Sequence, residues 1–274
     1  MRFSAGVPAL LVTACWLLTA QSSSTQSSAA RKKSVPSPPP TVPDSKPDPP
    51  PVVKLDTPTE KLTYEVEWRL IRAGTAVVES QKSHTQLKLE SAGMVSALFK
   101  VNDTYSVSYE DPFCATGSLM DSLEGRRHRE TKVTFDRSRN HATFLERDVI
   151  KNTVIRTNEI DVPNCVHEVV GALLELRAIP IEPGQSTQLP VSDGRRSAPV
   201  KIEAQEREEV KTSTGTHKTI RYEAYLLNGV IYPRKGRVFV WLTDDARRLP
   251  VQIRLRMQFP IGTVTLRLQK EEHS

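Results

Sequence analysis

The sequence lacks the motifs that mark the common catalytic and metal centres. Its six histidines are scattered, with no HxH or HExxH arrangement, and no two of its three cysteines have metal-ligand spacing. It has no GxSxG elbow, no GxxxxGK loop and no glycine-rich turn between a strand and a helix. We therefore predict no metal, no cofactor and no recognisable catalytic residue, which favours a protein that is not an enzyme.

Glycine is scarce and proline abundant, with 12 and 20 residues respectively among 274. Many of the prolines fall between Ser34 and Val53, after a segment rich in Ser, Ala and Gln, and this whole region has almost no large apolar side chain. Such a segment cannot bury enough surface to offset its ordering entropy. We expect residues 21–60 to be a disordered linker, either an extended tether or an inert tail.

The charge balance excludes a dedicated nucleic-acid protein. The net charge of +6 is modest for this length, and the basic residues are dispersed along the chain. With 38% apolar and 26% charged residues, the remainder of the chain can bury one core. We predict a single domain over residues 61–270, no nucleic-acid partner, and at most weak attraction to anionic surfaces.

The first twenty residues are typical of an export signal. Arg2 supplies a positive charge, an apolar run extends from Phe3 to Leu18, and cleavage can follow Ala20. A transmembrane anchor is the alternative, but about 16 apolar residues fall short of the roughly 20 needed to span a bilayer. We interpret residues 1–20 as a signal peptide that directs the protein to the periplasm or the outer membrane.

The three cysteines leave two questions open. Val12-Thr13-Ala14-Cys15 looks like a bacterial lipobox, in which Cys15 becomes lipidated, although Cys15 can equally be discarded with an ordinary signal. Cys114 and Cys165 then remain in a compartment that permits disulfides. They form either a disulfide or two separate buried thiols.

Most of the chain after residue 62 alternates apolar and polar side chains. Tyr64, Val66, Trp68 and Leu70 point one way, and the residues between them point the other way, as in a half-buried strand. The same period recurs downstream, for example around Leu87, Tyr105, Val133, Val200 and Ile220. The pattern predicts a mainly β domain.

One segment breaks this alternation. Residues 165–177 carry apolar side chains at helical spacing, with Asp161 or Asn164 as N-cap and Pro180 beyond the end. An amphipathic helix must cover something, and the surrounding sheet is the natural partner. We expect a curved antiparallel sheet or incomplete barrel wrapped around this one helix.

Two clusters of polar residues could be sites or ordinary structure. In the stretch from Val238 to Leu255, two acids and two arginines separate two apolar segments, which favours an exposed turn over a functional cluster. Asp111, Asp121 and Glu124 fall near loops and could supply paired carboxylates for glycoside hydrolysis.

Four residues are candidates for ligand binding. Arg126 and Arg127 suit a phosphate or carboxylate, and Trp68 and Trp241 suit an apolar or sugar ligand. The alternative is a solvated edge strand and two tryptophans of the core.

An ordered series of segments resembles a known family, the exported bacterial domain of unknown function 3108 (DUF3108), over roughly residues 62–268. The segments are YEVEWRLIRAGTA, EGRRHR, LELRAIPIEPG, VKTSTGTHKT, VWLTDDARRLPVQIRL and IGTVTLRL. The resemblance implies a β-rich bacterial envelope protein and assigns no reaction. A looser similarity links the expected architecture to periplasmic lipoprotein carriers, in which a curved sheet wraps a helix.

These observations lead to one hypothesis and two alternatives. We expect a non-enzymatic envelope protein that binds a lipid or other amphipathic molecule in a cleft between sheet and helix. A structural or adaptor protein with a filled core is the first alternative, and a glycan-directed hydrolase that uses Asp or Glu is the second. The patterns fix neither the oligomeric state nor a partner protein.

Overall fold

Strands follow one another along residues 59–273, the part of the chain that this computed structural model describes. The signal, Cys15 and nearly all of the linker lie outside the described residues. The elements are β1 (Glu60–Trp68), β2 (Ile71–Ser80), β3 (His84–Ser91), α1 (Gly93–Leu98), β4 (Val101–Glu110), β5 (Cys114–Glu124), β6 (Arg127–Asp136), β7 (His141–Asp148), β8 (Thr153–Asp161), α2 (Val169–Ala178), β9 (Ser186–Ser192), β10 (Ser197–Thr212), β11 (Gly215–Ala224), β12 (Gly236–Thr243), β13 (Pro250–Met257) and β14 (Thr263–His273).

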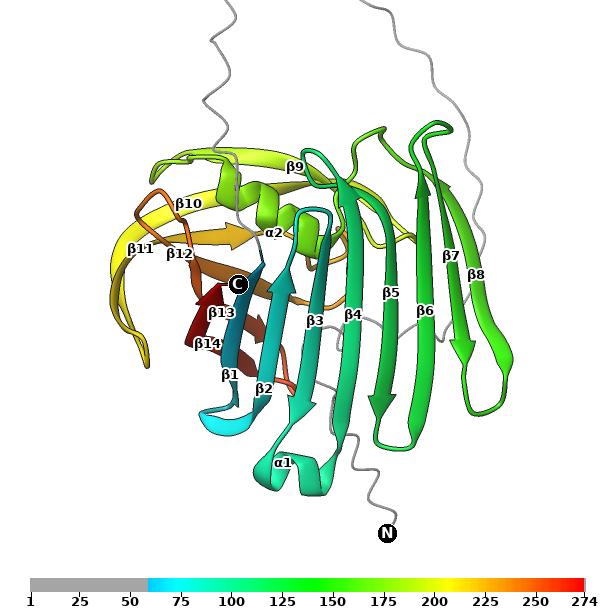
Figure 1. Cartoon of the computed structure of the whole chain (residues 1–274), viewed down its shortest axis with the longest axis horizontal. Helices are drawn as coiled ribbons and strands as arrows, with labels where there is room; N and C mark the ends of the chain where they lie inside the picture. Colours follow the sequence, from blue (N-terminus) through cyan, green and yellow to red (C-terminus); the bar gives the residue numbers. More distant parts are fainter. Residues whose placement is uncertain (1–58, 274) are drawn as a thin grey trace, which may run out of the picture.

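The described strands belong to one open antiparallel sheet of 14 strands. Its order is β8-β7-β6-β5-β4-β3-β2-β1-β14-β13-β12-β11-β10-β9, so each half is a simple meander and β1 pairs with β14 at the junction. Figure 1 shows the β2–β8 strands standing side by side, with the β9–β14 half running across behind them. The sheet is therefore sharply curved, as predicted.

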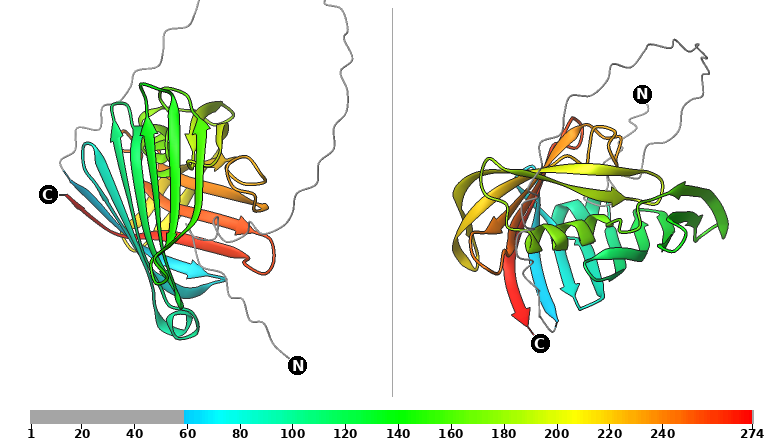
Figure 2. Two further views of the ribbon diagram at one scale, coloured as in Figure 1. Left: turned by 90° about the vertical axis from the view of Figure 1, so that its right-hand side faces the viewer. Right: turned by 90° about the horizontal axis from the view of Figure 1, so that it is seen from above.

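Helix α2 lies in the angle between the two halves of the sheet. The view from above in Figure 2 shows it between the β10–β11 side and the β2–β6 side. The expected sheet around a helix is confirmed.

The helix begins later than the spacing predicted. It starts at Val169, and its N-cap is Glu168, whose carboxylate accepts a hydrogen bond from the Val170 amide at 2.8 Å. Asp161 ends β8 and Asn164 lies in the connection, so neither is the cap. The residues before Val169 are held in other contacts, because His167 forms a bridge to Val191 of β9.

Alternation along the strands produces the core. On β1, Leu62, Tyr64 and Val66 are buried, and Glu65 alternates with them. Leu70 was expected on the same face, but it lies in the β1–β2 turn and is 90% exposed. The period of two holds only while the backbone is extended, and the left-handed residues Arg69 (φ 50°) and Leu70 (φ 70°) end it.

Gly74 allows β2 to run close to β3. A Cβ atom at this position would lie 2.1 Å from the carbonyl oxygen of Glu90. Only glycine fits there without moving the neighbouring backbone.

The two acids Asp244 and Asp245 and the two arginines Arg247 and Arg248 lie in the turn between β12 and β13. The Asp245 carboxylate accepts hydrogen bonds from the Thr243 hydroxyl and from the amides of Arg247 and Arg248, which is how Asp stabilises turns. The expectation of two exposed arginines is wrong for one of them. Arg248 is buried, and its guanidinium donates to the hydroxyl of Tyr222 and the carbonyl of Leu176.

Candidate functional site

A cavity of about 230 Å³ lies between α2 and the inner face of the sheet. Its walls come from both halves of the sheet and from the helix, and they are almost wholly apolar. Representative lining residues are Leu62, Val78, Leu89, Ala172, Val240 and Leu266. The volume is more than ten times the ~10–15 Å³ that holds one water molecule, and it approaches the ~300 Å³ lower bound of typical ligand pockets.

Small side chains leave this space open. Ala76 on β2, Ala172 on α2 and Ala224 on β11 all line the cavity, where larger residues would fill it. Away from the cavity, β11 buries a large side chain, Tyr222. The cavity therefore arises from alanines at inward positions and not from a general lack of packing.

A buried ion pair forms part of the cavity wall. Arg177, at the end of α2, donates to both carboxylate oxygens of Glu60 on β1, at 2.6 and 2.8 Å. It also donates to the carbonyl of Arg248 at 3.1 Å. Burial would raise the pKa of Glu60, but the hydrogen bonds and charge of Arg177 outweigh this effect and lower it. The pair keeps two charges in an apolar site and anchors α2 to β1.

A second polar group lies at the other end of α2. The fully buried Glu168 caps the helix, and burial raises the pKa of its carboxyl, although hydrogen bonds from Tyr105 and the backbone oppose this shift. Burial also raises the pKa of Tyr105. Both residues line the cavity. Hydrogen-bonding groups at both ends of α2 thus line the apolar cavity.

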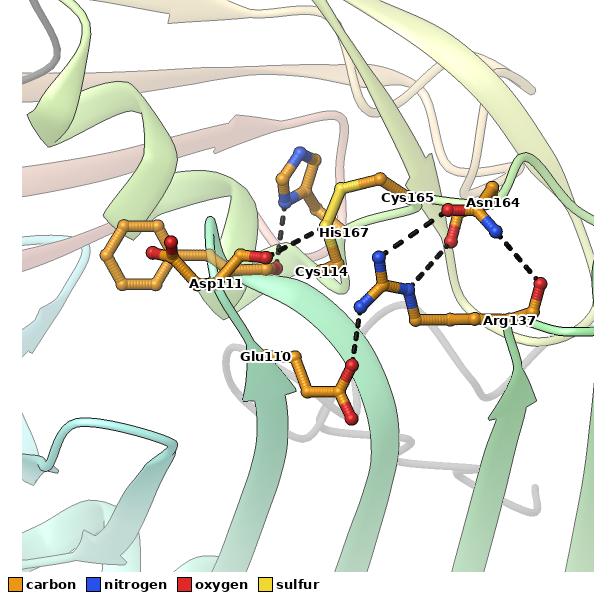
Figure 3. Close-up of a disulfide and its surroundings, with 8 residues drawn as sticks. Glu110, Asp111, Cys114, Arg137, Asn164, Cys165 and His167 are labelled. Carbon is orange, nitrogen blue, oxygen red and sulfur yellow. Dashed lines mark hydrogen bonds and ion pairs between the residues drawn. A yellow bond between two sulfur atoms is a disulfide. The ribbon is translucent and has the colours of Figure 1, made fainter.

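A disulfide between Cys114 and Cys165 fixes the segment before α2. Its Cα atoms lie 4.8 Å apart, and it joins the start of β5 to the β8–α2 connection, 51 residues later. Figure 3 shows the ring of His167 beside it, and the imidazole Nδ1 donates to the Phe113 carbonyl at 2.9 Å. The sequence left open a disulfide or two separate buried thiols, and the structure has the disulfide.

Polar contacts also hold the segment before α2. In Figure 3 the guanidinium of Arg137, from the β6–β7 turn, reaches Glu110 at 2.5 Å and the Asn164 carbonyl at 3.2 Å. The side-chain amide of Asn164 donates a hydrogen bond to the Arg137 carbonyl at 3.0 Å. The position of α2 is therefore set by a covalent link and by a network of hydrogen bonds.

Neither tryptophan proposed as a ligand contact lines the cavity. Trp241 is 3% exposed and donates to Glu208 at 2.7 Å, while Arg254 lies over its ring. It alternates with Val240, which does face the cavity, so its own side chain points to the opposite face of the sheet. Trp68 is half-buried and donates to the Ile261 carbonyl at 2.7 Å. Neither side chain therefore contributes to the wall of the cavity beneath α2.

The two proposed arginines also lie away from the cavity. Arg126 and Arg127 are exposed in and beside the β5–β6 turn. This turn is at the end of the sheet remote from α2 (Figure 1). The four predicted binding residues therefore do not form one site.

The three acids considered for hydrolysis do not converge. Asp111 lies in the β4–β5 turn, whereas Glu124 lies at the opposite end of β5. Asp121 is exposed and pairs with His128 at 2.6 Å, but Glu124 is buried. The arrangement gives no pair of carboxylates around a common space.

Sequence reasoning missed a different buried acid, Asp103 on β4. Burial, together with the charge of Glu124, raises its pKa to about 7. The alternation in the sequence does indicate a buried position, because Asp103 falls on the same face of β4 as Val101, Tyr105 and Val107. The pair of Glu60 and Arg177 was also missed, because the two residues are 117 positions apart in the sequence.

Residues 59–273 contain neither a cluster of potential metal ligands nor a membrane-spanning helix. No group of three or more His, Cys, Asp or Glu side chains is placed to hold a metal ion. No helix in that part of the chain is long and apolar enough to cross a bilayer.

One of the similar solved structures shares the fold at low sequence identity. A beta-barrel-like protein of domain of unknown function DUF1849 from Brucella abortus superposes with a TM-score of 0.52 at 7% identity, over 80% of this chain and 98% of that one. A protein from Bacteroides fragilis, named as exported and with a YmcC-like fold, gives a TM-score of 0.32 at 10% identity, covering 81% and 99%.

A third structure, named as a lipoprotein of Parabacteroides distasonis, gives a TM-score of 0.29 at 8% identity, covering 81% and 98%. No curated protein matches the sequence. The sequence model of the family described as protein of unknown function (DUF3108) matches residues 63–269, as the ordered segments predicted. The chain therefore belongs to the DUF3108 family.

Proposed function

We propose that this protein is a non-enzymatic component of the bacterial cell envelope that holds a lipid or another amphipathic molecule between α2 and the sheet. The observation that carries the proposal is the apolar cavity of about 230 Å³ beneath the helix. An apolar chain that enters such a space gains about 0.8 kcal/mol for each buried CH₂ group.

The polar groups in the wall suit an amphipathic ligand. Glu60 and Arg177 line one part of the cavity, and Glu168 and Tyr105 line another. A few placed polar groups in an apolar pocket are what orients a ligand with one polar end. The remaining wall supports an apolar chain and gives no basis for binding a sugar.

The cavity also separates this proposal from its alternatives. An adaptor with a filled core would have large side chains where Ala76, Ala172 and Ala224 stand. A glycan-directed hydrolase would need two carboxylates at a shared space, and the three acids considered above point to different parts of the sheet. The export signal predicted over residues 1–20 supports the location in the envelope.

Native mass spectrometry of the protein purified from its host tests the proposal. We expect a bound species of lipid mass that denaturing conditions release. The Ala172→Phe variant, which fills the cavity, should lose this species. The Ala246→Phe variant makes the same change at an exposed turn residue and should keep it. A folded wild-type protein that carries no bound species from its host would favour the filled-core adaptor.

A further inference from the structure

The turns of the β1–β8 meander divide into two sets at opposite ends of the sheet. The β1–β2, β5–β6 and β7–β8 turns and helix α1 lie together at the end remote from α2 (Figure 1). The β13–β14 loop joins them, because Arg69 donates to the carbonyls of Pro260 and Ile261. We call this the lower end of the sheet.

Large exposed apolar side chains concentrate at the lower end. Leu70 in the β1–β2 turn is 90% exposed, and Phe259 in the β13–β14 loop is 88% exposed. Within residues 59–273, the exposed large apolar residues lie in or beside these turns, apart from Leu119 and Tyr225. The set consists of Leu70, Ile71, Met94, Leu98, Val149, Ile150, Val154, Ile155 and Phe259. Such concentration marks an interaction surface.

The backbone holds Leu70 outward at a cost. Arg69 and Leu70 occupy the left-handed region, which Gly or Asn usually fills in a two-residue hairpin turn. The guanidinium of Arg69 lies over the ring of Trp68 and binds the neighbouring loop. A leucine kept in this conformation and exposed to water points to a function outside the fold.

Basic side chains accompany the apolar ones. Lys100 follows α1, and Arg126 and Arg127 lie next to it, since the Gly125 amide donates to the Lys100 carbonyl at 2.7 Å. All three are exposed, and none forms an ion pair with a residue of the described chain. Acids near this end are mostly engaged: Glu65 pairs with Arg72, and Asp148 with Lys151, although Glu90 is exposed.

The opposite end of the same strands differs. Its turns, Gln81–Ser83, Asp111–Phe113 and Arg137–Asn140, carry none of the exposed large apolar residues found in the described chain. Its arginines are paired, Arg137 with Glu110 and Arg139 with Asp136. The combination of exposed apolar and unpaired basic side chains is therefore specific to the lower end.

We propose that the lower end docks on an anionic membrane surface. Leu70, Phe259 and the apolar side chains of α1 would enter the headgroup region, while Lys100, Arg126 and Arg127 bind lipid phosphates. A second copy of this chain is a poorer occupant, because two basic ends would face each other across a symmetric interface. Docking does not depend on the cavity and stands whether or not a ligand occupies it.

Vesicle binding tests this surface. The full chain carrying Cys15→Ser, so that no acyl anchor can form there, is mixed with phosphatidylcholine vesicles with or without phosphatidylglycerol. We expect salt-sensitive binding that requires phosphatidylglycerol. Arg126→Gln with Arg127→Gln should weaken it by roughly 25-fold, at about fivefold for each lost charge. Leu70→Ser with Phe259→Ser should weaken it by about tenfold.

A matched control removes charge from the opposite end. Lys82→Gln with Arg139→Gln alters exposed bases in the β2–β3 and β6–β7 turns and should leave binding unchanged. Equal losses in the control and the lower-end variants would overturn the proposal. It would also fall if the wild type ignored phosphatidylglycerol, or if it formed a dimer in solution that the lower-end substitutions dissociate.

A fluorescent probe attached to the lower end reports whether that surface itself contacts the membrane. Binding through residues 1–58 would not produce this signal. An environment-sensitive fluorophore on Ile150→Cys should shift to the blue when vesicles containing phosphatidylglycerol are added. The same probe on Leu119→Cys, an exposed position within β5, should not shift. Equal shifts at the two positions would contradict docking through the lower end.

Discussion

Residues 59–273 have two apolar surfaces beyond their packed core, and the two differ in what surrounds them. The cavity beneath α2 is partly enclosed by strands and helix, and the charges of Glu60 and Arg177 in its wall are paired with each other. The lower end is open to solvent, and its bases Lys100, Arg126 and Arg127 have no acidic partner in the described chain. Enclosure selects for small ligands, whereas open apolar side chains beside free bases suit an extended anionic surface.

The comparison predicts that substitutions in the enclosed region change stability and that those at the lower end change binding. The largest effect should come from Arg177→Ala, which leaves Glu60 as a buried charge without its partner. We expect a loss of about 3–5 kcal/mol in the free energy of unfolding, measured by urea denaturation. Arg126→Ala, at the lower end, should change it by less than about 0.5 kcal/mol. Equal losses of stability in the two variants would contradict the distinction between the cavity and the lower end.

The pH dependence of stability provides a second test of the comparison, through the buried Asp103. Its carboxyl has a pKa of about 7 in the folded chain against 3.8 in the unfolded one, so the folded state retains a proton that the unfolded state loses. Stability from this group is complete below pH 4 and is lost as pH rises toward 7.

Asp103→Asn should remove this dependence and stabilise the protein at pH 8 by about 1–3 kcal/mol, with little effect near pH 4. Thermal melts of both proteins across this range provide the measurement. A variant that is less stable than the wild type at pH 8 would mean that the carboxylate makes a favourable contact there.

The smallest effect concerns Leu70. Leu70→Asn places a residue suited to the left-handed region in the β1–β2 turn, so it should raise the free energy of unfolding by about 0.5–1 kcal/mol while weakening vesicle binding. Leu119→Asn, also an exposed leucine but within a strand, should lower stability slightly. If Leu70→Asn destabilised the domain, the side chain would be supporting the fold and not a membrane contact.

Alternation was enough to predict the sheet, because residues such as Leu62, Tyr64 and Val66 must share one face of an extended strand. Helical spacing likewise predicted α2, with an error of four residues at its start. That error has a physical cause: Cys165 and His167 are held by a disulfide and a β-bridge, which local spacing does not reveal.

The candidate site was harder to predict than the fold. A cavity depends on the sum of side-chain volumes from strands far apart in sequence, and the three alanines that open it have no local signature. Glu60 and Arg177 are 117 residues apart, so their pairing follows only from the topology. The tryptophans were conspicuous by type, but Trp241 faces away from the cavity because its register is opposite to that of Val240.

Titration of a fluorescent fatty acid into delipidated protein tests the central claim, that the space under α2 holds an apolar ligand. We predict saturable binding of one molecule per chain by the wild type and by Ala246→Phe, and binding at least about tenfold weaker by a folded Ala172→Phe variant, whose ring occupies the cavity. Equal affinity in all three proteins, or no saturable binding by the wild type, would contradict the account.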